Sequence, residues 1–365
     1  MKAAQLPVQR PGNARLLVVD AGGCVRDLPR ARLLDQMRPG DLLVANDAAT
    51  MPASLGGMHL GSGKPVELRL AARDSLAPEA IRQFSAVLFG AGDWRTRTED
   101  RPEAPAVRRG DRLVLGPLQA RVLATLGSPR LLRVEFAGTP DAIWAGLARH
   151  GRPVQYAHLA QPLALWDVWT RVAAQPVAFE APSAGFMLDW ELLAKLRTRG
   201  VGFATLTHAA GLSSTGDAAL DARLPLPEPY HLPAITVEAI AQAHGRGGRV
   251  VAVGTTVARA LEDSAARHGR PRAGMAVAQL RLGLRTPLRV VDVLVSGTHE
   301  PGTSHYELLQ AFAPQPTLQR MSRALEAWGY RTHEYGDSVW LERAQPAGST
   351  ARRPVAADTV LTASP

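Results

Sequence analysis

The sequence has few of the residues that mark an oxidising compartment, a membrane or a thiolate metal site. Cys24 is its only cysteine, which excludes an intrachain disulfide and a zinc site built mainly from thiolates. No run of about 18 apolar residues occurs, and residues 1–20 lack the basic head and apolar core of a secretory signal. We therefore expect a cytoplasmic protein, a monomer or weak oligomer, with no membrane partner and no metal.

Lysine is almost absent as well. Lys2, Lys64 and Lys195 are the only lysines, so arginine supplies nearly all of the 42 positive charges, against 33 acidic residues. The formal net charge of +9 fits attraction to a polyanion such as RNA, and it equally fits the arginine bias of a GC-rich genome. With 46% hydrophobic and 21% charged residues the composition is otherwise that of a globular protein, and 365 residues suggest about two domains.

The pattern of hydrophobic residues changes along the chain. Short β-type runs separated by turn residues occur at 66–70, 86–91, 112–115, 120–126 and 131–136, and they predict a small β-barrel or sandwich over 63–150. The flanking segments, 1–62 and 151–343, alternate buried strands with amphipathic helices, which predicts one discontinuous α/β domain. The expected fold class is thus mixed α/β, a layered main domain with this small β unit inserted in it. Residues 344–365 show no periodicity, and we expect a disordered tail.

Polar residues follow several predicted strands of the main domain. The strands are expected at 41–45, 177–179, 201–206, 249–253 and 288–295, and the polar residues after them are Asn46 and Asp47, Pro182 to Gly185, His208, Gly254 to Thr256, and His299. In open α/β sheets a ligand binds in the crevice outside the carboxyl ends of the strands. We therefore expect these loops to build one site.

Each local signal also has a plainer interpretation. Gly254, Thr255 and Thr256 precede a predicted helix whose free amide groups suit a carboxylate, phosphate or ribose, but the same residues also fit a tight turn before a capped helix. His208 and His299 suit acid–base work near neutral pH, although most loop histidines are structural. Three tryptophans around the 182–185 loop could stack on a base or simply pack in the core; they are Trp166, Trp169 and Trp190.

Five sequence blocks, in this order, resemble the QueA family of S-adenosylmethionine:tRNA ribosyltransferase-isomerases. They are GDLLVAND at 40–47, APSAG at 181–185, VAVGTTVARALE at 251–262, VVDVLV at 290–295 followed by His299, and YGDSVWL at 335–341. The resemblance implies an α/β domain with an inserted barrel. It also implies transfer of the ribosyl part of S-adenosylmethionine, the co-substrate, to a 7-aminomethyl-7-deazaguanine base in the anticodon loop of tRNA. This step of queuosine biosynthesis forms epoxyqueuosine, while adenine and methionine leave.

The resemblance places a set of residues around the crevice. The catalytic candidates are Asp47, His208, Glu228 and His299. The residues expected to bind S-adenosylmethionine are Asn46, Pro182, Gly185, Gly254, Thr255, Thr256 and Arg259. Such a reaction needs a base for the proton beside the sulfonium, a proton for the leaving adenine, and a neutral acceptor amine.

The chain also departs from the family pattern. Ala49 and Ser54 stand where family members usually carry arginine, and Met187 and Leu226 stand where they carry histidine. Three functions are therefore compatible with the sequence. They are the tRNA ribosyltransferase-isomerase itself, a paralogue that uses S-adenosylmethionine with another acceptor, and a non-catalytic RNA-binding relative.

Overall fold

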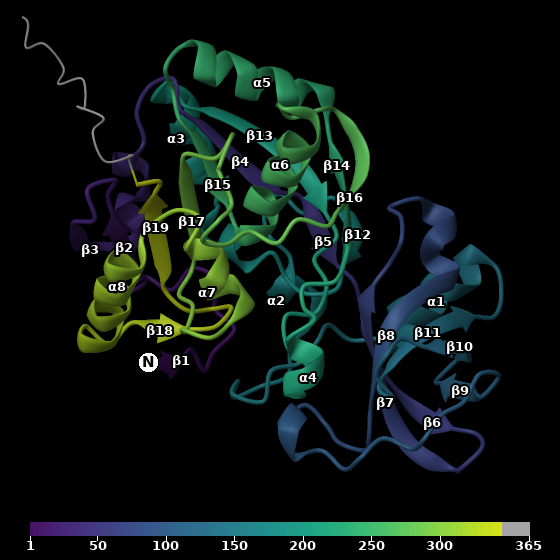
Figure 1. Ribbon diagram of the computed structural model, residues 1–365. Helices are drawn as coiled ribbons and strands as arrows, with labels where there is room; N and C mark the ends of the chain where they lie inside the picture. The colour runs from purple at the N-terminus through teal and green to yellow at the C-terminus, as the bar shows by residue number, and fades with distance from the viewer. Residues whose placement is uncertain (345–365) are drawn as a thin grey trace, which may run out of the picture.

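The computed structural model describes residues 1–344, so the predicted tail lies outside the described residues except for Ala344. Two bodies lie side by side: a layered α/β body and, at the lower right of Figure 1, a barrel. The expected fold class, a mixed α/β main body with a small β-barrel, is confirmed. No helix among residues 1–344 is long and apolar enough to cross a membrane.

The main body is built on a nine-stranded mixed sheet. Its strands, in spatial order, are β16 (Gly274–Ala278), β14 (Glu228–Leu232), β13 (Gly202–His208), β4 (Leu42–Asn46), β15 (Val250–Val253), β17 (Val293–Gly297), β19 (Ser338–Glu342), β2 (Arg15–Val19) and β3 (Val25–Pro29). The four central strands β13, β4, β15 and β17 are parallel. Side chains of β4 alternate between the two faces, because Leu42 and Val44 join one apolar cluster and Leu43 and Ala45 another. The sheet is therefore covered on both sides.

Helices cover the two faces unequally. One face packs against α5 (Ala234–Gly245), α6 (Thr255–His268), α7 (Ser304–Leu309) and α8 (Gln315–Ala327), and the other against α3 (Trp190–Thr198) and the 3-10 turns η1 (Arg30–Gln36) and η4 (Ser183–Met187). Gly200 after α3 and Gly269 after α6 have φ of 70° and 76°, so each of these helices ends in a left-handed glycine. Two single-turn helices, α2 (Leu165–Val168) and α4 (Ala218–Asp221), lie in connecting segments.

The barrel is closed and antiparallel. Its strands, in order around the barrel, are β10 (Leu118–Thr125), β11 (Leu131–Phe136), β8 (Gln83–Phe89), β7 (Lys64–Ala72), β6 (Ser54–His59) and β9 (Arg112–Leu115). Helix α1 (Pro140–His150) packs Ile143 and Leu147 into the same core. β6 was not predicted, because its central Gly56 and Gly57 are not typical of a strand. The expected start of the insertion at residue 63 therefore falls between two barrel strands, β6 and β7. The division into domains stays a prediction.

Two strand ends of the main sheet also differ from the prediction. β17 begins at Val293 rather than at residue 288, because the amides of 289–291 donate instead to the Glu262 carboxylate at 2.8–2.9 Å. β13 continues to His208, which therefore ends a strand rather than following one.

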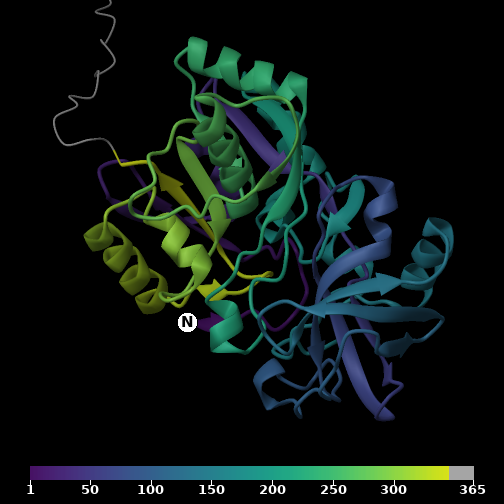
Figure 2. The same ribbon diagram turned by 45° about the vertical axis from the view of Figure 1, so that its right-hand side comes forward.

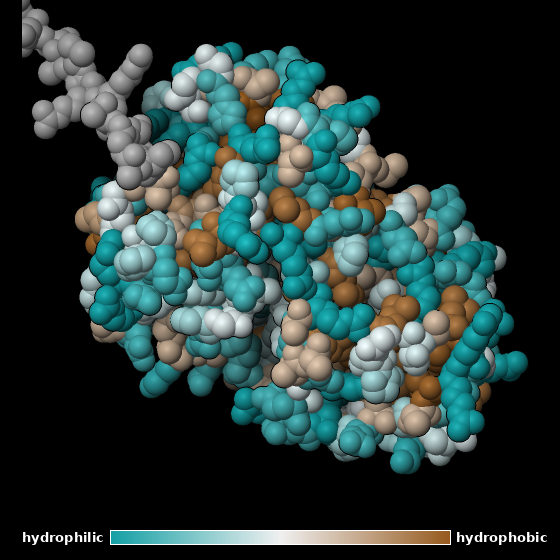
Figure 3. All heavy atoms as spheres, viewed as in Figure 1, coloured by the Kyte–Doolittle hydropathy of each residue, from teal (hydrophilic) through white to brown (hydrophobic). Residues whose placement is uncertain are grey.

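The chain itself brings the barrel to the carboxyl end of β4. After Asn46 the chain forms β5 (Ala48–Thr50), which pairs in parallel with β12 (Gln175–Ala178), and then enters β6. On the return side, Leu212, Leu220 and Leu226 of the segment after β13 pack against the barrel core. Figure 2 shows the barrel beside this edge of the sheet. In the face shown in Figure 3, hydrophilic residues dominate and apolar residues gather in small patches.

Candidate active site

Asn46 joins three elements at the carboxyl edge of the sheet. Its amide Nδ2 donates to the His208 carbonyl at 3.0 Å and to Thr256 Oγ1 at 3.4 Å, and its Oδ1 accepts from the His208 amide at 2.9 Å. The side chain is buried, so these hydrogen bonds replace water that it lost on folding. Asn46 therefore fixes the ends of β4 and β13 against the start of α6.

A buried ion pair lies next to Asn46. The Arg259 guanidinium donates from Nη1 to Glu228 Oε2, and its other nitrogens reach the carbonyls of Leu226, Ala278 and Leu280 at 2.9–3.1 Å. Glu228 Oε1 accepts from the Gly211 amide at 2.5 Å. Burial raises the pKa of the Glu228 carboxyl, while Arg259 acts in the opposite direction. Arg259, expected to bind an anion of the co-substrate, thus already has a carboxylate of the protein itself.

His208 is fully buried at this pair. Glu228 Oε2 lies 3.5 Å from its Nε2, and neither ring nitrogen has a hydrogen-bond partner among residues 1–344. Burial first, and then the Arg259 charge, lower the pKa of His208 to about 3, so that the ring is neutral at pH 7. We call Asn46, His208, Glu228, Thr256 and Arg259 the strand-end cluster.

The two glycine-containing loops meet beside the strand-end cluster. Gly254 has φ of 101°, which a side chain disfavours, and a Cβ placed on it would lie 3.5 Å from Ala184 Cβ. The loop of Pro182 to Gly185 therefore lies against the turn before α6, and Gly185 itself lies against Thr170. Within the part of the chain that the structure describes, no side chain caps the start of α6, and Thr255 and Thr256 are half-buried there. The arrangement leaves amide donors at this edge, which suits a carboxylate or a ribose hydroxyl.

Asp47 faces away from His208. Its carboxylate accepts from the hydroxyls of Thr205 and Thr207 at 2.8 and 2.6 Å. Because side chains alternate along a strand, these threonines lie on the other face of β13 from the His208 ring. Of the catalytic candidates, Asp47 is thus the one that the sheet separates from the strand-end cluster.

His299 belongs to a second group of histidines. Its ring stacks on His305 with centroids 4.9 Å apart, and His158 and His333 form another close pair at 4.3 Å. Burial, with His305 and His333, holds the pKa of His299 well below its usual value, and its Nε2 is buried without a hydrogen-bond partner in the described residues. Within residues 1–344, no hydrogen bond or ion pair joins His299 to the strand-end cluster.

A buried carboxyl group missed by the sequence analysis lies at the start of the 181–185 loop. Glu180 is 9% exposed and has no ion-pair partner in the described part of the chain. Burial, and then the neighbouring Glu334 carboxylate, raise the pKa of Glu180 to about 8. Its position directly before APSAG was a usable signal, because an acidic residue there precedes a motif singled out on other grounds.

The four departures from the family pattern are all in packed surroundings. Ala49 is buried in β5, Met187 and Leu226 pack against apolar clusters, and no titrating group replaces the expected ones at these positions. Ser54 donates to Glu67 at 2.8 Å, and that buried carboxylate is also paired with Arg69 and Arg101. Two other arginines therefore neutralise the charge that faces position 54.

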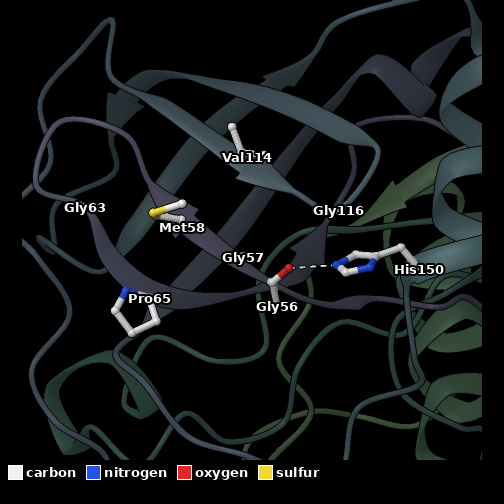
Figure 4. Close-up of a pocket in the computed structure, with 8 residues that line it drawn as sticks. All are labelled: Gly56, Gly57, Met58, Gly63, Pro65, Val114, Gly116 and His150. Atoms are coloured by element: carbon white, nitrogen blue, oxygen red, sulfur yellow. Dashed lines mark hydrogen bonds between the residues drawn. The ribbon is translucent and has the colours of Figure 1, made fainter.

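A hollow of about 400 Å³ lies elsewhere, on the barrel (Figure 4). It is lined by Gly56, Gly57 and Val114, and His150 Nε2 closes one end by a 2.7 Å hydrogen bond with the Gly56 carbonyl oxygen. A Cβ on Gly57 would lie 2.0 Å from the Val114 carbonyl oxygen, so only glycine allows β9 to approach here. None of the predicted site residues lines this hollow. Across residues 1–344, no three His, Cys, Asp or Glu side chains are grouped to hold a metal ion.

Comparison with known proteins gives a consistent result. The family profile described as "Queuosine biosynthesis protein" matches residues 1–341. The S-adenosylmethionine:tRNA ribosyltransferase-isomerase of Pelobacter propionicus is 32% identical over 343 residues, which cover 92% of this chain and 94% of that protein. The enzyme of the same name from Anaeromyxobacter dehalogenans is 34% identical over 351 residues, covering 93% and 95%.

One solved structure also aligns along the chain. The crystal structure of S-adenosylmethionine tRNA ribosyltransferase from Thermotoga maritima is 23% identical, with a TM-score of 0.48, and covers 93% of this chain and 95% of that one. The family assignment rests on the profile and on the sequence relatives. With a match that spans nearly all of the described residues, this chain belongs to the queuosine biosynthesis protein family.

Proposed function

We propose that the protein is an S-adenosylmethionine:tRNA ribosyltransferase-isomerase of queuosine biosynthesis. Relatives that carry this name are 32–34% identical over 92–93% of the chain. The geometric observation that carries the proposal is the meeting of three sequence blocks, 40–47, 181–185 and 251–262, at one edge of the sheet. Asn46 bonds to Thr256, and Gly254 lies against Ala184.

In this proposal the start of α6 binds S-adenosylmethionine. Gly254 lets the backbone approach the co-substrate closely, and Thr255 and Thr256 offer hydroxyls beside the free amides of the helix start. The positive end of the helix dipole favours the methionine carboxylate. Pro182 and Gly185 then form an adjoining wall, since Ala184 of their loop lies against Gly254.

The hydrogen-bond partners separate proton carriers from positioning residues. Both oxygens of Asp47 and both oxygens of Glu228 are taken up by internal donors, so we assign these carboxylates to positioning. His208 and His299 have ring nitrogens without partners among the described residues, and burial lowers the pKa of both, so each ring is neutral near pH 7 but weakly basic. We keep these two histidines as the candidates for proton transfer on the strength of their free ring nitrogens.

The acceptor in this proposal is a 7-aminomethyl-7-deazaguanine base in the tRNA anticodon loop. The reaction joins the ribosyl carbons to the aminomethyl nitrogen and releases adenine and methionine. The test is to incubate the full chain with S-adenosylmethionine and tRNA that carries this base, and to measure adenine and the mass of the modified nucleoside. We expect one adenine per modified nucleoside. A folded protein that binds both substrates and releases no adenine would contradict the proposal.

A second candidate is the use of S-adenosylmethionine with a different acceptor. The packing of Met187 and Leu226 favours it, because apolar side chains fill positions where the family carries histidine. Calorimetry would distinguish it from the first. Binding of S-adenosylmethionine without tRNA, together with no adenine release on the aminomethyl tRNA, is the result expected of this paralogue. A non-catalytic RNA-binding relative would bind the RNA alone.

A further inference from the structure

The 182–185 loop, which lies against Gly254 beside the strand-end cluster, is followed by residues that contact a second surface feature. This feature is a groove with two exposed tryptophans. It encloses about 330 Å³ and is lined by Gln9, Arg10, Trp166, Asp167, Trp169 and Arg171, which we call the tryptophan groove. The Trp166 side chain is 76% exposed and Trp169 is 42% exposed. Large apolar rings held in water at the edge of a polar groove typically mark a binding surface.

The groove is held in place by hydrogen bonds that leave its rings free. The Gln9 amide nitrogen donates to the carbonyls of Asp167 and Trp169, both at 2.9 Å, which ties the N-terminal segment to the single turn of α2. Trp169 Nε1 donates to the Thr50 carbonyl at 2.9 Å, and Asp167 accepts from the Ala164 amide at 2.8 Å. The backbone of the groove and the Trp169 ring are therefore fixed before any ligand arrives, and the Trp166 ring lies open to the solvent beside them.

One cation of the groove is free to meet a phosphate. Arg171 is exposed and forms no side-chain hydrogen bond or ion pair within the described residues. Arg10 donates to the carbonyls of Phe186 and Leu188 at 3.1 and 3.4 Å, and partial burial and the nearby Arg171 charge lower its pKa. The carboxylates of Asp167 and Asp189 lie close by, but each caps a helix start. The guanidinium of Arg171 is thus available to a ligand.

The groove and the proposed active site share one loop. Arg10 binds the carbonyl of Phe186, next to Gly185, and Trp169 binds the strand that follows Asp47. A ligand that occupies both places must extend around this loop, as a nucleic-acid strand can. Exposed aromatic rings beside arginines are the usual means of binding single-stranded RNA, because every base has a face that can stack.

We propose that the tryptophan groove binds a nucleotide flanking the modified position in single-stranded RNA, with its base stacked on Trp166 and its phosphate on Arg171. This inference rests on the proposed function for the identity of the RNA. It assigns the groove to the RNA strand and leaves S-adenosylmethionine at the start of α6.

The test uses a fluorescein-labelled RNA hairpin with the anticodon-loop sequence of the substrate tRNA, titrated with the full chain. Trp166→Ala should raise its Kd about 5- to 150-fold, because stacking contributes about 1–3 kcal/mol per base. Trp166→Phe keeps a ring and should restore most of the affinity. Arg171→Ala should lower the slope of log Kd against log salt by about 0.7–0.9, the value for one lost phosphate contact.

The matched control is Trp328→Ala. Trp328 is 42% exposed, as Trp169 is, but it lies at the end of α8 outside the groove. Unchanged hairpin affinity in Trp166→Ala, with the fold intact by circular dichroism, would overturn the proposal. So would weaker binding of S-adenosylmethionine with RNA binding unchanged, since the groove would then hold the adenine. Adenine release by the wild-type protein is measured separately, so failure of the proposed function is distinguishable from failure of the groove.

Discussion

The strand-end cluster and the tryptophan groove lie on two sides of one loop and differ in how their polar groups are used. In the cluster, Arg259 and Glu228 are buried and joined to each other and to backbone groups. In the groove, Arg171 is exposed and has no internal partner among residues 1–344. In the cluster the charged groups bind each other and the backbone and so hold the strands together, whereas in the groove one charged group faces the solvent.

The difference distinguishes motif residues that bind other parts of the protein from residues that are free to bind a ligand. A residue whose donors and acceptors are all satisfied inside the protein positions its neighbours, whereas one with unsatisfied groups can bind a ligand. In the strand-end cluster only the His208 ring nitrogens are buried without a partner, as far as residues 1–344 show. We therefore expect substitutions in the cluster to change stability most and substitutions in the groove to change RNA binding most.

The largest expected effect is that of Arg259→Ala. It leaves the Glu228 carboxylate buried without a cation, and we expect the free energy of unfolding to fall by about 3–5 kcal/mol. The matched variant is Arg171→Ala, which removes the same side chain from the groove and should change stability by less than about 0.5 kcal/mol. Urea unfolding of both variants measures the difference. Equal losses would show that the two regions are not distinct in the way described.

Glu180 tests the same distinction between partnered and unpartnered groups. It is buried, as the strand-end cluster is, but it has no cation partner in the described residues. Its pKa is about 8 in the folded state against an ordinary 4.5, so between these values the folded state binds more protons than the unfolded state. Wild-type stability should therefore fall as pH rises from about 4.5 to 8, by at most about 1.4 kcal/mol per pH unit.

Glu180→Gln does not titrate, so its stability relative to wild type should grow over this pH range. The control is Glu135→Gln. Hydrogen bonds from Gln83 and Arg121 lower the pKa of Glu135, so its glutamine variant should show the opposite trend, a relative loss as pH rises through the acidic range. Thermal melts at a series of pH values test both. A pH-independent difference for Glu180→Gln would mean that this carboxyl is ionised in the folded protein.

The smallest expected effect is a difference in stability between variants of the two tryptophans of the groove. Trp169→Phe removes the hydrogen bond to the Thr50 carbonyl and should lower stability by about 1 kcal/mol. Trp166→Phe removes an indole that has no such bond and should leave stability within about 0.5 kcal/mol. If both variants melt like wild type, Trp169 does not tie the groove to the strand after Asp47.

Much of the fold was predictable because its signals are local. The β-branched run at Val250–Val253, the glycines that end α3 and α6, and five of the six barrel strands follow from periodicity and turn residues. β6 was missed because Gly56 and Gly57 are there for the close approach of β9, which no local pattern reveals. The early start expected for β17 failed because a distant carboxylate, Glu262, takes the amides of 289–291.

The position of the candidate site could be predicted from the sequence, but the chemical roles of its residues could be predicted less well. That Asn46, Gly254 and His208 meet follows from their positions at the ends of parallel strands. That Arg259 is neutralised by Glu228, and that Asp47 turns to the other face of β13, depends on side-chain directions set by tertiary packing. The sequence also did not predict the tryptophan groove, because Gln9 and Arg10, which line it, are far from Trp166 in the sequence.

The most direct test compares two affinities in two variants. Dissociation constants for S-adenosylmethionine, by calorimetry, and for the labelled RNA hairpin, by anisotropy, would be measured for wild type, Thr255→Val and Trp166→Ala. Thr255→Val should weaken S-adenosylmethionine about 2- to 10-fold, the value of one hydrogen bond, and leave the hairpin unchanged. Trp166→Ala should weaken only the hairpin. If either variant weakens both ligands equally, or if the two effects are exchanged, the division of the surface between co-substrate and RNA is wrong.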